Sequence, residues 1–279
     1  MKSAPAIEVN GLVKQYGGRR VVDQISFRVD HGEIFGLLGP NGAGKTTTVE
    51  ILEGLRPRDG GSAAVVGLDS ASLRPVDRNR IGVVTQSTAD RTMLSVREIL
   101  RLYAAYYADP LPVDEVIEAV GLAEKATARI TTLSGGQRRR VDVALGITGR
   151  PEVLFLDEPT TGFDPAARRE FWGLIKRLRE RGTTVLLTSH YLDEVDYLAD
   201  RIAIIAAGQL KAIGSTTQIQ QEHGAAAIVR WRDATGLHEE PTDTPIALIR
   251  RLLPADGELA GLEVRRPTLE DTYLKLLEA

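Results

Sequence analysis

Short, nearly continuous apolar segments alternate along the chain with longer segments of helical periodicity, a pattern typical of α/β proteins. The apolar segments are residues 34–38, 81–85, 153–157 and 183–189. Because each is apolar at both even and odd positions, we expect strands that are buried on both faces of a mainly parallel sheet. Residues 7–10 and 21–29 are instead strand-like segments near the N-terminus, the second alternating apolar with polar positions, which predicts an exposed face.

Helical periodicity dominates from residue 94 to about residue 149 and predicts an all-helical insert. A further helix is expected at 166–181, and a hairpin around Gly208. From about residue 218 the pattern changes to strand, helix, strand and helix. These four elements are expected at residues 225–231, 245–253, 262–265 and 269–277. We therefore predict one domain of residues 1–217 and a small α+β accessory domain of residues 218–279.

A glycine-rich loop joins the predicted strand at 34–38 to the start of a helix. It consists of Gly39, Pro40, Asn41, Gly42, Ala43, Gly44, Lys45, Thr46 and Thr47, and it matches the pattern G-x-x-x-x-G-K-[ST]. Glycines let backbone N–H groups approach phosphate oxygens, and the helix N-terminus adds about half a positive charge. We expect Lys45 to reach the β- and γ-phosphates of a nucleoside triphosphate, and the Thr46 hydroxyl to bind Mg²⁺. The alternative is an ordinary glycine-rich turn.

Polar side chains follow three of the predicted strands at their carboxyl ends, where α/β sheets bind ligands. They are Gln86, the pair Asp157 and Glu158, and His190. We expect Asp157 to hold Mg²⁺ and Glu158 to polarise an attacking water. Gln86 is a candidate contact for Mg²⁺ or water, and His190 could bind the γ-phosphate or hold a water. The alternatives are a surface glutamine, helix-capping acids and a structural histidine.

A second anion site is predicted far from the glycine-rich loop in the sequence. Ser134 is a natural helix N-cap, and the residues after it, Gly135, Gly136 and Gln137, leave backbone N–H groups open at a helix start. Three arginines, residues 138–140, follow. The alternative interpretation is a plain helix start with a solvated arginine face.

Tyr16 lies in a turn ahead of the glycine-rich loop. Its flat ring offers a surface on which a nucleobase can stack. An ordinary hairpin tyrosine explains the same position equally well.

Composition excludes several classes of protein. The 279 residues include 35 Lys+Arg and 38 Asp+Glu, and this near balance argues against a nucleic-acid partner. There are no cysteines, which excludes disulfides and thiol chemistry. The first residues have no signal-peptide pattern, and no apolar run approaches the roughly 20 residues that span a bilayer. We expect any membrane role to be peripheral and to depend on a partner.

The ordered set of motifs resembles the ATP-binding subunit of ABC transporters over roughly residues 5–217. This resemblance implies a P-loop NTPase core of mainly parallel sheet with an antiparallel β subdomain, a helical insert and a small α+β C-terminal tail. It also implies ATP and Mg²⁺ as cofactors. The implied roles are adenine stacking for Tyr16, the Q-loop for Gln86, the signature motif for Ser134, Gly135, Gly136 and Gln137, magnesium binding for Asp157, the catalytic base for Glu158, the D-loop aspartate for Asp164 and the switch histidine for His190.

Members of this family dimerise head to tail, so the resemblance implies a homodimer that encloses two Mg-ATP molecules. Residues 267–274 look like the closing helix of drug-resistance exporter ATPases, whose permeases belong to the ABC-2 class. The expected location is the cytoplasmic side of the cell membrane, with attachment through that permease. Phe163 stands where the family usually has Leu, and it is expected to fill the same apolar role.

Two other function classes are weighed against an exporter ATPase. One is a soluble ABC-type ATPase that acts on nucleic acid or the ribosome, but the long insertions and second cassette typical of those proteins are not visible. The other is a kinase or GTPase, which needs neither the Ser134 motif nor His190. Import in place of export is disfavoured by the C-terminal tail, and the cargo is not encoded in this chain.

Overall fold

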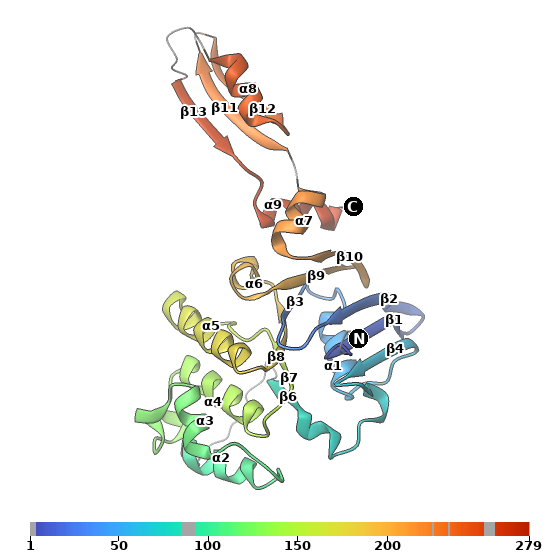
Figure 1. Cartoon of the computed structure of the whole chain (residues 1–279), viewed down its shortest axis with the longest axis vertical. Helices are drawn as coiled ribbons and strands as arrows, with labels where there is room; N and C mark the ends of the chain where they lie inside the picture. Colours follow the sequence, from blue (N-terminus) through green and yellow to red (C-terminus); the bar gives the residue numbers. More distant parts are fainter. Residues whose placement is uncertain (1–3, 85–92, 225, 234, 254–259, 279) are drawn as a thin grey trace. The chain divides into compact units, whose positions relative to one another are not determined.

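A computed structural model describes residues 4–84, 93–224, 226–233, 235–253 and 260–278 of the chain. The chain divides into two compact units, Met1–Ile213 and Gly214–Ala279 (Figure 1). Among the helices of the described residues, none is long and apolar enough to cross a membrane.

A six-stranded sheet forms the centre of the first unit, with the strand order β10-β9-β3-β8-β7-β6. The strands are β3 (Ile34–Leu38), β6 (Ile81–Val84), β7 (Val153–Asp157), β8 (Thr184–Ser189), β9 (Arg201–Ala206) and β10 (Gln209–Gly214). The four central pairings that β3, β6, β7, β8 and β9 make are parallel. In register, Leu38 is opposite Ser189, and Asp157 is opposite Thr188. The carboxyl ends of β3, β7 and β8 therefore lie along one edge of the sheet.

An antiparallel sheet from the first part of the chain packs with helix α1 (Lys45–Leu52). Its order is β2-β1-β4-β5, from β1 (Ile7–Tyr16), β2 (Arg19–Val29), β4 (Gly60–Val65) and β5 (Leu68–Asp69). Phe27 of this sheet stacks on Phe35 of β3, with ring centroids 5.3 Å apart. A shared apolar core, which includes Val49 and Ile51, thus attaches α1 to both sheets.

The helical insert begins after β6 and ends before β7. It contains α2 (Val96–Ala104), α3 (Val113–Ala119) and α4 (Gly135–Ile147), with short 3₁₀ turns at Ala123–Lys125 and Ile130–Thr132. Two more 3₁₀ turns, Ser70–Ser72 and Asp77–Arg80, precede β6. Helices α5 (Pro165–Glu180) and α6 (Leu192–Leu198) flank β8 in the sequence. Apolar residues of α2 to α5 share a core with the sheet, and Phe171 of this core is completely buried.

The second unit is a three-stranded antiparallel sheet with helices. It contains α7 (Thr216–His223), β11 (Ala227–Asp233), β12 (Gly236–Thr242), α8 (Pro245–Leu252), β13 (Ala260–Arg265) and α9 (Leu269–Glu278). Strand β11 lies between β12 and β13. Val229 and Trp231 of β11 pack against Leu248 of α8, which gives this unit its own small core.

The predicted fold class is confirmed, because the structure has the mainly parallel sheet, the antiparallel sheet, the helical insert and the α+β tail. The elements that the sequence analysis missed include α6, α7, the two-residue strand β5 and β12. Helices α6 and α7 have only 7 and 8 residues, too few for helical periodicity to be recognised. Strand β12 is an edge strand with no buried residue, so its sequence carries no apolar pattern.

Candidate functional site

The glycine-rich loop connects the end of β3 to α1, as predicted. Gly44 has φ +104°, and a Cβ there would lie 2.4 Å from the carbonyl oxygen of Val21. A Cβ on Gly39 would lie 2.2 Å from the carbonyl oxygen of Ile205. Only glycine fits at these two positions, so the loop keeps the open backbone that a phosphate cradle needs.

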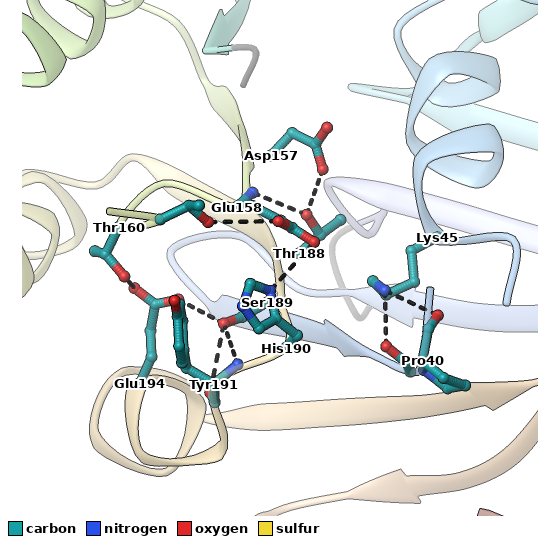
Figure 2. Close-up of polar contacts among 12 residues, drawn as sticks. Pro40, Lys45, Asp157, Glu158, Thr160, Thr188, Ser189, His190, Tyr191 and Glu194 are labelled. Carbon is teal, nitrogen blue, oxygen red and sulfur yellow. Dashed lines mark hydrogen bonds and ion pairs between the residues drawn. The ribbon is translucent and has the colours of Figure 1, made fainter. Parts of the chain in front are cut away.

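Lys45 is the first residue of α1, and its side chain turns back into the loop (Figure 2). Its Nζ donates hydrogen bonds to the carbonyl oxygens of Gly39 at 2.7 Å and Pro40 at 3.2 Å. Burial lowers the pKa of the Lys45 ammonium, while the negative charges of Glu158 and Asp157 act in the opposite direction. The loop therefore holds a buried cation at its centre, at the position where the sequence analysis predicts a phosphate contact.

The predicted acids and the histidine meet at the carboxyl ends of β7 and β8 (Figure 2). His190 Nδ1 lies 3.3 Å from Glu158 Oε1. Thr188 Oγ1 donates to Asp157 Oδ1 at 2.5 Å and accepts from the backbone N–H of Glu158 at 3.0 Å. One threonine thus orients both acids, with Asp157 anchored on the sheet edge and Glu158 next to the histidine.

Glu158 has φ +44°, in the left-handed region that side chains other than glycine rarely adopt. Such conformations persist where the surroundings enforce them, and they are common at active sites. Backbone hydrogen bonds around the residue do this here, including one from the Glu158 N–H to the carbonyl oxygen of Thr188 at 3.2 Å.

The second predicted anion site is the N-terminus of α4. Ser134 Oγ accepts from the Gln137 N–H at 3.2 Å, and Gln137 Oε1 accepts from the Ser134 N–H at 3.0 Å, which forms a capping box. A Cβ on Gly135 would meet no atom within 4 Å, so the backbone is open there. Gly135 lines a cavity of about 300 Å³ together with Glu158 and Phe163.

The three arginines after Gln137 do not form one solvated face. Arg139 is only 6% exposed, and Arg140 pairs with Glu170. Arg139 Nη2 donates to the carbonyl oxygen of Asp157 at 2.9 Å, and its Nε donates to that of Pro159 at 3.0 Å. The alternative of a solvated arginine face is therefore wrong for Arg139, which connects α4 to the loop that carries Glu158.

Asp164 caps α5, because its Oδ1 accepts from the N–H groups of Ala166 and Ala167, both at 2.9 Å. The neighbouring Phe163 packs edge-on against Phe171, with centroids 5.6 Å apart. Phe163 thus makes an apolar contact, which is the role expected for it.

Tyr16 is the last residue of β1, in the hairpin before β2, and its side chain is 42% exposed. Arg56 donates to its hydroxyl at 2.6 Å, and the cationic groups of Lys14 and Arg56 lie 5.4 and 5.5 Å from the ring centroid. Adenine stacking on this ring stays a prediction. Thr46 is an exposed residue of α1, and Gln86 lies outside the residues that the structure describes.

Sequence reasoning missed two buried acids near the site. Glu53, at the end of α1, is buried, and its burial together with the negative charges of Asp157 and Glu50 raises its pKa to about 8. Glu194 of α6 is completely buried among hydrogen-bond donors. Acids on short helices normally face solvent, so nothing in the linear pattern distinguishes these two.

Three comparisons relate the sequence and the fold of this chain to known proteins. Residues 22–161 match the model of the ABC transporter family. The chain is 43% identical to the daunorubicin/doxorubicin resistance ATP-binding protein DrrA of Streptomyces peucetius, over 82% of this chain and 71% of that protein. It is 38% identical to the daunorubicin resistance ATP-binding protein DrrA3 of Streptomyces coeruleorubidus, over 97% and 95% of the two chains. A solved ATP-binding subunit of an ABC transporter superposes with a TM-score of 0.70 at 26% identity, over 78% of this chain and 93% of that one.

Proposed function

The chain belongs to the ABC transporter family of ATPases, in the drug-resistance exporter subfamily, and we propose that it drives a separate ABC-2-type permease that exports a drug. The similarity to drug-resistance ATP-binding proteins along 97% of the chain supports this proposal most strongly, because it includes the second unit. A polycyclic antibiotic is the proposed cargo class, since daunorubicin is named for two of the relatives. Lipid and polysaccharide-like cargo are the alternatives.

The residues of the site fit ATP and Mg²⁺. The glycine-rich loop offers backbone N–H groups and the Lys45 cation to the phosphates. The Thr46 hydroxyl and the Asp157 carboxylate are hard oxygen ligands of the kind that Mg²⁺ prefers. When bound, Mg²⁺ neutralises charge on the β- and γ-phosphate oxygens.

Glu158 is the proposed general base for the attacking water. His190 is proposed to orient the Glu158 carboxylate. A carboxylate accepts a proton from water, and the imidazole 3.3 Å away limits where that carboxylate points. Asp157 contacts Thr188 and is placed to bind the metal, so the two adjacent acids have different roles.

The open helix start at Ser134 is proposed to bind the γ-phosphate held by Lys45 of a second copy. A capped helix with free backbone N–H groups and a positive dipole end is a binding site for an anion. In a head-to-tail homodimer this face completes the phosphate loop of the partner, and two ATP molecules are enclosed.

Replacing Ser134 by Arg tests the shared site. We expect turnover to fall at least about 30-fold, because the bulky cation blocks closure, while ATP affinity changes less than about threefold. In the Glu158→Gln background, size-exclusion chromatography with ATP is expected to show a dimer, and Ser134→Arg is expected to restore the monomer.

Ser215→Arg is the matched control, because Ser215 caps α7 with the same Ser–Gln capping box. It removes an equivalent cap, worth about 1 kcal/mol, from a helix that contains none of the residues proposed to bind ATP. Normal hydrolysis by Ser134→Arg would contradict the shared-site arrangement.

Export is tested in cells that carry the chain together with a candidate ABC-2-type permease. We expect cells with wild-type protein to exclude doxorubicin, measured by its fluorescence. Cells with Glu158→Gln should accumulate the drug to the level of cells that lack this protein, because ATP hydrolysis no longer drives the permease. Glu180→Gln, at an exposed acid of α5, should behave as wild type. Drug exclusion that survives Glu158→Gln would contradict the proposal that hydrolysis by this chain drives export. Tight, salt-sensitive DNA binding by the purified chain would favour the nucleic-acid alternative.

A further inference from the structure

A buried carboxylate behind the site collects hydrogen bonds from three parts of the chain. Glu194 of α6 has no exposed surface. Its Oε1 accepts from Thr160 Oγ1 at 2.8 Å and from Trp172 Nε1 at 3.1 Å, and its Oε2 accepts from Ser189 Oγ at 2.6 Å. Figure 2 shows the bonds from Thr160 and Ser189. Fully buried acids are rare and are normally paired, so Glu194 can stay buried only because the fold supplies these three donors.

Two of the three donors are neighbours of the proposed active groups. Thr160 follows Glu158 by two residues, and Ser189 directly precedes His190. Both donors are buried, at 0% and 1% exposure, so water does not replace either bond. The two oxygens of one carboxylate therefore join the loop of Glu158 to the strand end of His190.

The Ser189 side of this connection also orients the histidine. Ser189 Oγ accepts from the Tyr191 N–H at 3.0 Å. The Tyr191 ring lies against the His190 ring, with centroids 4.1 Å apart. His190 is thus held from the residue before it and the residue after it, and both depend on the hydroxyl that Glu194 binds.

The loop that carries Glu158 is also held by a buried arginine, whose charge is opposite to that of Glu194. Arg139 holds the carbonyl oxygens of Asp157 and Pro159, which flank Glu158. Burial lowers the pKa of Arg139, and the negative charges of Asp142, Asp157 and Glu194 oppose that effect. Arg139 therefore links the backbone on both sides of Glu158 to the same buried region that contains Glu194.

We propose that Glu194 is a positioning residue for ATP hydrolysis, which keeps the Glu158 carboxylate and the His190 imidazole in their mutual geometry. Trp172 Nε1 can only donate, and the Thr160 and Ser189 hydroxyls both donate to the carboxylate here. An amide at position 194 would place its N–H₂ group against one of these hydroxyls and force that hydroxyl to accept, which changes the hydrogen bonds at that segment. This inference rests on the proposed roles of Glu158 and His190.

Glu194→Gln is the primary test, with steady-state phosphate release measured against ATP concentration. We expect kcat to fall at least about tenfold, because sub-ångström displacement of a general base is costly, and KM to change less than about twofold. The KM is spared because the phosphate loop is not among the partners of Glu194. Trp172→Phe removes the third donor without releasing either loop, so its kcat should stay within about twofold of wild type.

Thr160→Val and Ser189→Ala provide a second measurement that does not depend on the folding of Glu194→Gln. Each removes one hydroxyl, and if Glu194 couples the two segments, the kcat loss of the double variant is smaller than the product of the single losses. Losses that multiply, or a Glu194→Gln protein with wild-type kcat, would overturn the positioning role. Wild-type hydrolysis by Glu158→Gln would overturn the proposed base instead, which separates the two failures.

Discussion

Glu158→Gln is expected to lower ATP turnover by at least about 100-fold, equivalent to about 2.7 kcal/mol in the barrier, because a general base commonly contributes this much. The amide keeps the size of the side chain but no longer accepts a proton from water. ATP affinity should change less than about threefold, since the Lys45 loop is untouched. Phosphate release and equilibrium binding of ATP measure the two quantities separately.

The fold of the variant is expected to be preserved. The contact with His190 at 3.3 Å is possible for an amide oxygen, and the bonds from Arg139 go to backbone carbonyls, which the substitution leaves in place. Glu180→Gln, which neutralises an exposed acid on α5, serves as the charge control and should hydrolyse ATP normally. Unchanged turnover by Glu158→Gln would show that another group activates the water.

Lys45→Ala is expected to abolish measurable hydrolysis and to weaken ATP binding at least about tenfold, because a desolvated cation at the phosphates is lost. Lys45 is 5% exposed, and its Nζ is held by two carbonyl oxygens of the loop. Removing it also leaves the negative charges of Asp157 and Glu158 near the phosphates without the opposing charge of Lys45. Isothermal titration with ATP and a phosphate-release assay measure both effects.

Lys45→Met separates the charge from the packing of the lysine stem. Since methionine fills most of the same volume, we expect it to lose hydrolysis as Lys45→Ala does while keeping the thermal midpoint of the wild type. Lys176→Ala removes a lysine that contacts Tyr197 on another face, and it should leave ATP binding unchanged. Hydrolysis that survives in Lys45→Met would place the essential phosphate contact elsewhere.

Several structural elements could be predicted because the physics that forms them is local. The continuous apolar runs at β3, β7 and β8 leave no polar face, so these strands had to be central in a sheet. The glycine-rich loop is recognisable because the glycines at 39 and 44 avoid clashes with neighbouring carbonyl oxygens. Short or polar elements such as α6 and β12 were not predictable, because they are stabilised by neighbours far away in the chain.

The sequence by itself determined the chemistry available to this protein: a phosphate loop with one lysine, two adjacent acids, a strand-end histidine and an uncovered helix start. These depend on residue type and close spacing. Only the tertiary structure decided which groups work together, because Glu158 and His190 are 32 positions apart and come into contact through the parallel pairing of β7 with β8. The roles of Arg139 and Glu194 could be recognised only in the tertiary structure for the same reason. A charged residue is expected to be exposed to water from its sequence alone, and only the fold shows that these two are buried.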